Sequence, residues 1–163
     1  MSKKYALFFV FLFYFSITTL HAQTLASFYA AFVASFEKSS WRLYEKEIFP
    51  SYETYKQRFH LHHDANTTKK YEALRQKVYR SWHEAIQQLP SGASLQIIST
   101  QETLMCPTKD VQTRCYKHTL KLKANEKYLA IELHDCFDDD RVRCYGVLEA
   151  NISTVPFAKR PLK

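Results

Sequence analysis

The chain has 163 residues, and its 23 lysines and arginines against 16 acidic residues give a formal net charge of +7. The basic residues are scattered and no binding motif accompanies them, so the sequence predicts no nucleic-acid partner. With only two glycines, the chain also lacks the glycine-rich loops of dinucleotide-binding and phosphate-loop enzymes.

The N-terminal segment has the pattern of a signal peptide. Two lysines precede the apolar run Tyr5–Phe15, and the small-residue sequence Leu20–Gln23 follows it. This is the order of charged region, apolar region and cleavage site in exported proteins. The apolar run is shorter than the roughly 20 residues of a membrane span. We predict a signal peptide over residues 1–22, with an uncleaved anchor as the alternative, and a periplasmic or secreted mature protein without stable membrane insertion.

The next part of the chain has the apolar spacing of helices. Between Leu25 and Phe36 the apolar residues recur mostly three and four positions apart, which marks one face of a helix. Ser39 or Ser40 and then Ser51 can cap two short helices, and Asn66 can cap a long one. The predicted helices cover approximately residues 25–38, 41–48, 52–59 and 66–89.

Beyond Pro90 the apolar period changes to two, which is typical of strands. A tight hairpin at Asn125 and Glu126 aligns the apolar residues of its two strands on one face. The predicted strands cover approximately residues 95–106, 114–124, 127–136 and 142–150. The predicted cross-strand pairs are Leu122 with Leu129, Leu120 with Ile131, His118 with Leu133, Leu133 with Val147 and Cys136 with Cys144.

These elements predict one α+β domain over residues 23–150. Its N-terminal helices pack on a curved four-stranded antiparallel meander, because the helices supply the surface that can cover the apolar face of the sheet. Residues 151–163 are predicted to form a flexible basic tail.

The four cysteines of the chain fall at the ends of the predicted strands. In an exported domain they predict two disulfides. The pairing of Cys106 with Cys115 and of Cys136 with Cys144 joins neighbouring strands across single turns, and the rival pairing joins Cys115 to Cys136. A redox pair or zinc site is disfavoured because the chain contains no Cys-x-x-Cys motif.

The order of elements resembles the nuclear transport factor 2-like (SnoaL-like) superfamily of cone-shaped α+β domains. The segment Trp41–Phe59, with its Glu47-Ile48-Phe49-Pro50-Ser51 step, and the strand pair Tyr128–Glu149 look like small exported Bacteroidetes proteins of unknown role. Their leaders often end in Ala-Gln, as Ala22-Gln23 does here. The resemblance implies a sheet and helices that enclose a pocket able to hold a ligand.

Three residues are candidates for chemistry in such a pocket. His118 lies on the predicted inward face, and Tyr116 and Asp135 are placed on the same face opposite each other. A histidine and a carboxylate can act as general base and orienting group, as enzymes of this superfamily often do. The alternative is a hydrogen-bonded core histidine with a solvated Asp135.

A second group of candidates lies between the predicted helices, where His60, His62, His63 and Asp64 crowd one loop. Imidazole ligands suit zinc, copper and nickel. Neighbouring residues of one loop rarely supply a whole site, so we predict no metal and no cofactor.

Taken together, these features predict an exported, non-catalytic binding or accessory domain whose partner is a small molecule or a protein. One alternative is a small hydrolase, isomerase or dehydratase that uses His118 with Asp135. Another is a protein-binding inhibitor or immunity-type factor, which requires an exposed apolar or charged patch.

Overall fold

The computed structural model describes residues 24–90, 92–106, 114–138 and 141–154. The predicted signal peptide and the predicted tail beyond residue 154 lie outside these residues. The prediction of a flexible tail from residue 151 is wrong for residues 151–153, which belong to the last strand of the sheet. Within the described residues, no helix is long and apolar enough to cross a membrane.

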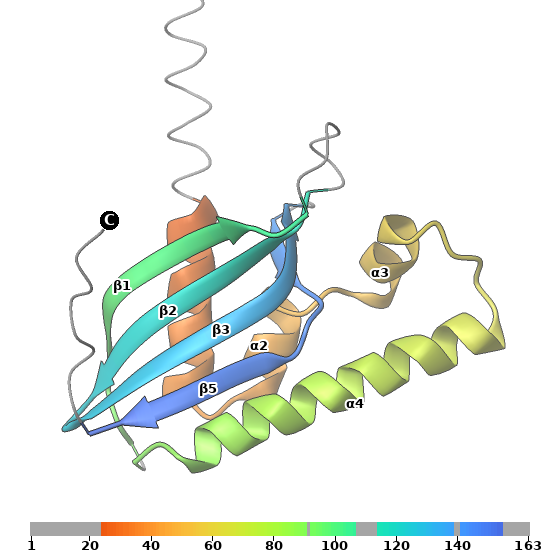
Figure 1. Cartoon of the computed structure of the whole chain (residues 1–163). Coiled ribbons are helices and arrows are strands. Elements are labelled where there is room, and N and C mark those ends of the chain that lie inside the picture. The colour runs from red at the N-terminus through yellow and green to blue at the C-terminus, as the bar shows by residue number, and fades with distance from the viewer. Residues whose placement is uncertain (1–23, 91, 107–113, 139–140, 155–163) are drawn as a thin grey trace, which may run out of the picture.

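Helices occupy the first part of the described residues, and side chains cap the N-termini of the last three. A first helix covers residues 24–37, and α2 (Trp41–Glu47), α3 (Tyr52–Arg58) and α4 (Ala65–Gln87) follow (Figure 1). Ser40 and Ser51 cap α2 and α3, as predicted. The predicted cap at Asn66 is wrong, because Asp64 accepts the hydrogen bond from the Thr67 amide at 2.6 Å and starts α4 earlier. That hydrogen bond lowers the pKa of Asp64.

The second half of the chain forms an open antiparallel sheet of five strands. These strands are β1 (Leu95–Leu104), β2 (Tyr116–Ala124), β3 (Lys127–Asp138), β4 (Val142–Cys144) and β5 (Leu148–Ser153). The order is β1-β2-β3-β4, and β5 also pairs with β3. The α+β class is therefore confirmed, but the prediction of four strands is wrong because the last predicted strand is divided in two.

A kink in β3 explains this division. Asp135 has a φ of 51°, and the amides of Tyr145 and Gly146 donate to the carbonyls of Asp135 and His134. Gly146 passes so close to β3 that a Cβ atom there would lie 2.7 Å from the His134 Cβ. The chain therefore leaves the β4 ladder here and resumes as β5, where Leu133 pairs with Leu148. The predicted partner, Val147, is wrong by one residue.

The predicted register of the hairpin is confirmed. Cross-strand partners are Leu122 with Leu129, Leu120 with Ile131 and His118 with Leu133, and Cys136 faces Cys144. The disulfides join Cys106 to Cys115 and Cys136 to Cys144, so no cysteine is free. The two disulfides indicate an oxidising environment such as the extracellular space.

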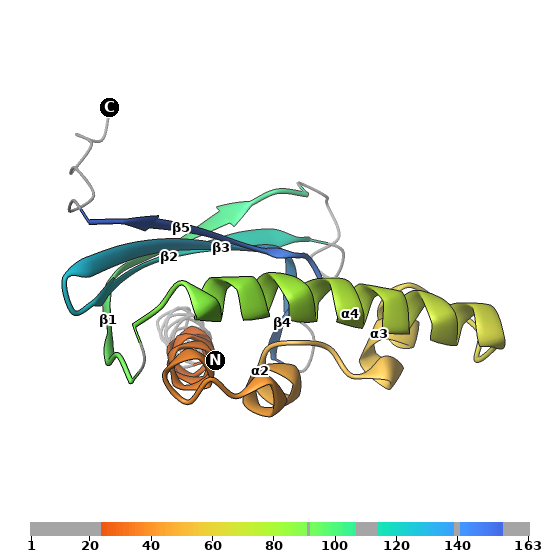
Figure 2. The same cartoon turned by 90° about the horizontal axis from the view of Figure 1, so that it is seen from below.

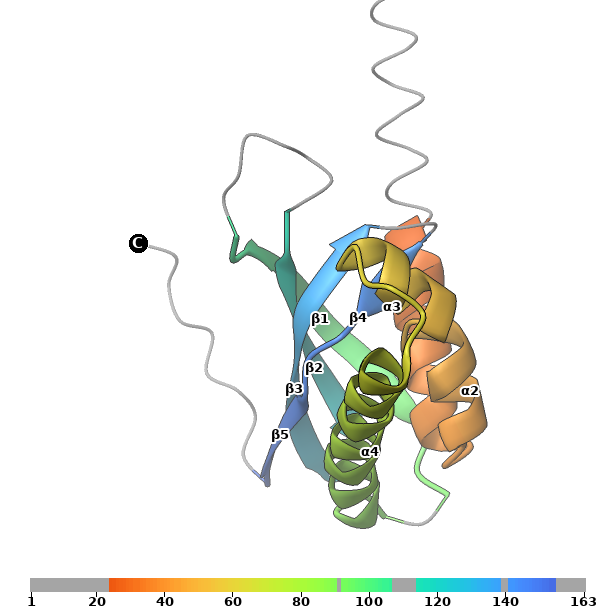
Figure 3. The ribbon, with the colours of Figure 1, turned by 90° about the vertical axis from the view of Figure 1, so that its right-hand side faces the viewer.

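All helices lie on one side of the sheet, as Figures 2 and 3 show. The residues that face them from β2 and β3 are fully buried, and aromatic residues of the helices fill the layer between. Its completely buried apolar members include Phe32, Tyr44, Phe49, Val78, Leu120, Leu122, Leu129, Ile131 and Leu133.

This burial predicts a difference between two leucines of the sheet. Leu120 is 0% exposed and Leu104 is 45% exposed. Leu120→Ala should lower the free energy of unfolding by about 2–5 kcal/mol, because it removes buried apolar contacts and leaves a cavity. Leu104→Ala should change it by about 0.5 kcal/mol or less. Urea denaturation measures both, and equal losses would contradict the position of the core.

Candidate functional site

His118 lies inside the protein, where β2 meets the first helix. Its side chain is 1% exposed, and its ring packs against Phe28, with 5.2 Å between the ring centroids. The Nδ1 atom lies 3.0 Å from the hydroxyl oxygen of Tyr29, within hydrogen-bond distance. His118 is therefore a buried histidine with a hydrogen-bond partner in the core.

The carboxylate that faces His118 is Glu102 of β1. The two residues are direct cross-strand partners, and the Nε2 atom of His118 lies 3.8 Å from the Oε2 atom of Glu102. This is an ion-pair distance and too long for a hydrogen bond. Tyr29, His118 and Glu102 thus form a row of polar groups at the inner face of the sheet, and the Glu102 end of the row is accessible to solvent.

Asp135 takes no part in this row. It is exposed at the kink of β3, and Tyr116 faces Cys136 across the strands, so the predicted opposition of Tyr116 and Asp135 is wrong. Tyr116 is half-buried, and its ring centroid is 6.5 Å from that of His118. The kink shifts the register by one residue, which moves Asp135 away from the inward face.

Two members of the row were missing from the sequence prediction for different reasons. Glu102 could have been found by extending the alternation of β2 to β1, because cross-strand partners share a face. Tyr29 lies on a helix 89 residues away in the sequence from His118, and only the packing of helix on sheet brings the two together.

The electrostatic surroundings of the row favour the protonated form of Tyr29. Burial raises the pKa of Tyr29, and the nearby charge of Glu102 raises it further, while a hydrogen bond with Thr100 opposes the shift. Tyr29 therefore keeps its proton at neutral pH and is a poor nucleophile. The arrangement is suited to holding the first helix on the sheet.

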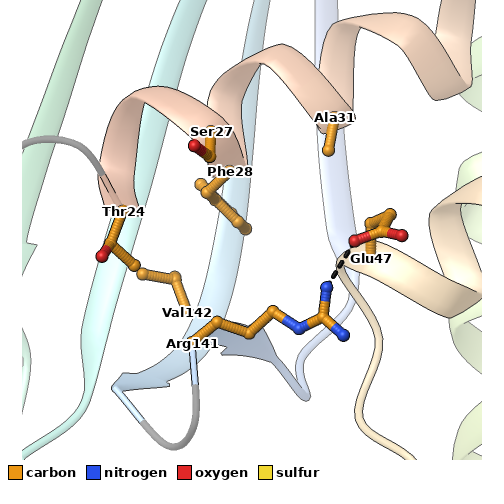
Figure 4. A pocket seen from close by; sticks show the side chains of 7 residues that line it. All are labelled: Thr24, Ser27, Phe28, Ala31, Glu47, Arg141 and Val142. Atoms are coloured by element: carbon orange, nitrogen blue, oxygen red, sulfur yellow. Dashed lines mark hydrogen bonds and ion pairs between the residues drawn. The ribbon is translucent and has the colours of Figure 1, made fainter.

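An open pocket lies on the other side of Phe28. It has a volume of about 280 Å³ and is formed by the first helix, the end of α2 and the start of β4 (Figure 4). Glu47 and Arg141 form an ion pair in its wall. The remaining lining residues are Thr24, Ser27, Phe28, Ala31 and Val142.

The pocket lining combines apolar and polar chemistry. Phe28, Ala31 and Val142 offer apolar surface, and Thr24 and Ser27 offer hydroxyl groups. His118 is not among the lining residues, although Phe28 contacts it. Phe28 therefore contacts both the pocket and the buried row.

The histidine-rich loop does not assemble a site of converging ligand atoms. His63 packs its ring against Tyr52, with 5.5 Å between centroids, and Asp64 is occupied as the cap of α4. Among the described residues, His60, His62, His63 and Asp64 are not part of any group of three or more side chains whose ligand atoms lie close together. The group that does converge is Glu132, His134 and Glu149.

Comparisons with protein-family models, with curated proteins and with solved structures found no match to this chain.

The hydrogen bond between Tyr29 and His118 predicts a pH-dependent loss of stability. Tyr29→Phe should lower the free energy of unfolding by about 1–3 kcal/mol at pH 7, because a buried ring nitrogen loses its partner. An unfolded chain ionises its tyrosines near their ordinary pKa of 10.0, whereas the folded state resists ionising Tyr29. The difference between wild type and variant should therefore be complete below this pKa and shrink above it.

Urea denaturation between pH 7 and pH 11 measures this effect. The exposed Tyr79→Phe variant is the control and should stay within about 0.5 kcal/mol of wild type. A Tyr29→Phe penalty that grows with rising pH would contradict the assignment.

Proposed function

We propose that this protein is an exported, non-catalytic binding module of the nuclear transport factor 2-like kind, and that it binds a small molecule in the pocket between the first helix and β4. The order of helices before an antiparallel sheet supports the superfamily assignment, as does the placement of all helices on one face. The two disulfides support export.

The open pocket is the observation that carries the proposal. Ligand sites are concave, mostly apolar and supplied with a few polar groups, and they usually measure roughly 300–1,000 Å³. At about 280 Å³ this pocket is at the lower limit, so it suits a ligand of one ring or a short chain. Phe28 and Val142 are 5% and 1% exposed, so the half-buried Ala31 is the main apolar residue that such a ligand can contact.

The ion pair sets the polarity of the ligand. Arg141 supplies donors and Glu47 supplies acceptors, and their charges balance. A polar group that both donates and accepts, such as a hydroxyl, an amide or a zwitterionic head, matches this wall. A single strong charge would have to compete with the existing pair.

The buried row favours binding over catalysis. An enzyme that used His118 with Asp135 would need both groups beside the substrate. His118 is shielded from solvent and its hydroxyl neighbour Tyr29 resists ionisation, whereas Asp135 lies exposed at the kink of β3. The pocket wall contains neither His118 nor Asp135.

Filling the pocket tests the proposal. Ala31 lines the pocket, whereas Ala30 on the same helix is exposed and outside it. Ala31→Leu should weaken the binding of small ring compounds at least about tenfold, equivalent to about 1.4 kcal/mol, because the added carbons occupy their space. Ala30→Leu should bind as wild type does. Both changes keep a good helix former.

Proton–nitrogen NMR titration with benzyl alcohol, benzamide and phenylalanine measures this binding. The expected shifts are centred on Phe28, Ala31 and Val142. Shifts that survive in Ala31→Leu, or the absence of binding by every probe, would contradict the pocket as the ligand site.

The exposed edge of the sheet favours a second candidate function, which is protein binding by strand addition. Strand β1 pairs only with β2 among the described strands, and most of its residues are exposed. Ile97, Ile98, Leu104 and Met105 are 39%, 50%, 45% and 52% exposed. Edge strands are often protected by lysines, prolines or bulges; β1 has no lysine or proline, and its pairing with β2 is irregular between Ile97 and Ser99. This apolar edge is the patch that an inhibitor or immunity-type factor requires.

Lysine substitutions at this edge test the second candidate. Extended peptides selected from a random library for binding to the protein should bind Ile98→Lys/Leu104→Lys at least about tenfold more weakly, a loss of about 1.4 kcal/mol. A charge beside the added strand interrupts its apolar contacts. Tyr79→Lys, at an exposed site on α4, is the matched control. Equal binding to both variants, measured by biolayer interferometry, would contradict strand addition at β1.

A further inference from the structure

The face of the sheet turned away from the helices carries a group of metal-binding side chains. Glu132 and His134 lie two residues apart on β3, so they share this face, and Glu149 on β5 is the direct cross-strand partner of Glu132. One ligand atom from each of the three lies within 4.8 Å of the others. All three side chains stand on paired strands, which fix their relative positions.

The distances suit a divalent metal. The Nε2 atom of His134 lies 3.7 Å from a carboxylate oxygen of Glu132 and 3.8 Å from one of Glu149. Ligand atoms about 2.0–2.1 Å from a tetrahedral zinc ion are about 3.3 Å apart. The ligand atoms, which lie within 4.8 Å of one another, would therefore have to approach by between about 0.4 and about 1.5 Å to form three metal bonds.

Without a cation, this arrangement leaves groups unsatisfied. The Nε2 atom of His134 is shielded from solvent and has no hydrogen-bond partner. Glu132 and Glu149 carry like charges directly opposite each other, which destabilises a strand pair. Lys117 contacts Glu132 at 3.1 Å and neutralises part of this charge. An ion held by His134 and both carboxylates would satisfy the nitrogen and relieve the repulsion together.

The backbone around His134 fixes the point from which its side chain leaves the strand. The Gly146 amide donates to the His134 carbonyl at 3.0 Å, and the chain at Gly146 runs against the His134 Cβ. A substituted residue at position 146 would displace His134, so glycine is required by close approach there. Rigid support of this kind is what a metal ligand needs.

We propose that Glu132, His134 and Glu149 form a binding site for a divalent transition metal, with Zn²⁺ as the best match to one imidazole and two carboxylates. The site leaves coordination positions open toward solvent, where Glu149 is 66% exposed. Its position on the outer face of the sheet makes it independent of the pocket. Bound metal joins β5 to β3 and stabilises the folded state.

Zinc titration of the oxidised, untagged protein tests this site. Isothermal titration calorimetry should show one Zn²⁺ per chain, and His134→Ala and Glu149→Gln should each weaken binding about tenfold or more. Because all four cysteines are in disulfides, thiolates do not compete for the metal. Zinc should also raise the melting temperature of wild type and leave that of His134→Ala unchanged.

The triple variant His60→Ala/His62→Ala/His63→Ala is the matched control, because it removes the three imidazoles of the other histidine group. It should bind Zn²⁺ as wild type does. Loss of binding in this variant would overturn the proposal in favour of the loop, and unchanged binding by Glu149→Gln and His134→Ala would overturn it as well. Circular dichroism verifies that each variant is folded, and the visible spectrum of the Co²⁺ complex reports the coordination number of the bound metal.

Discussion

The close contact between Gly146 and His134 determines how the C-terminal part of the fold is arranged. The pairing of β4 with β3 ends before this contact, and β5 begins two residues after Gly146. Strand β5 then pairs with β3 in the register that places Leu148 opposite Leu133. Strand β4 turns toward the helices, where the Cys144 amide donates to the Ile48 carbonyl at 3.0 Å. One wall of the pocket, the Cys136–Cys144 disulfide and the position of His134 all depend on this contact.

Arg143 secures the same junction from inside the protein. The residue is 5% exposed, and its guanidinium donates to the carbonyls of Lys46 and Phe49 at 2.7 and 3.1 Å. These carbonyls lie at the end of α2, where helical hydrogen bonds are lacking and the helix dipole is negative. The guanidinium of Arg143 donates to carbonyl oxygens that have no helical partner, and it thereby holds β4 against the end of α2. These hydrogen bonds offset part of the cost of burying the charge.

The pattern of the sequence was sufficient for the parts of the fold that depend on local periodicity. Alternation in β2 and β3 gave the hairpin register, and serines before apolar runs gave two of the helix caps. The division of the last strand could not be read this way, because a kink at Asp135 with positive φ leaves no mark in an apolar pattern. The predicted opposition of Tyr116 and Asp135 was wrong for the same reason, since the kink moves Asp135 away from the inward face. The contact of Tyr29 with His118 could not be predicted because only tertiary packing creates it.

The two faces of the sheet carry polar groups of different kinds: buried groups that are bonded within the protein on one face, and groups that solvent can reach on the other. Toward the helices, His118 is enclosed with Tyr29, and its surroundings resist ionisation of the hydroxyl. Away from the helices, Glu132 and Glu149 remain open to solvent beside an unsatisfied imidazole nitrogen. Burial of a polar group demands a partner in the protein, whereas a partly exposed group can take its partner from solution. Ligand binding is therefore expected where polar groups are preorganised and still reachable, at the pocket wall and on the outer face of β3 and β5.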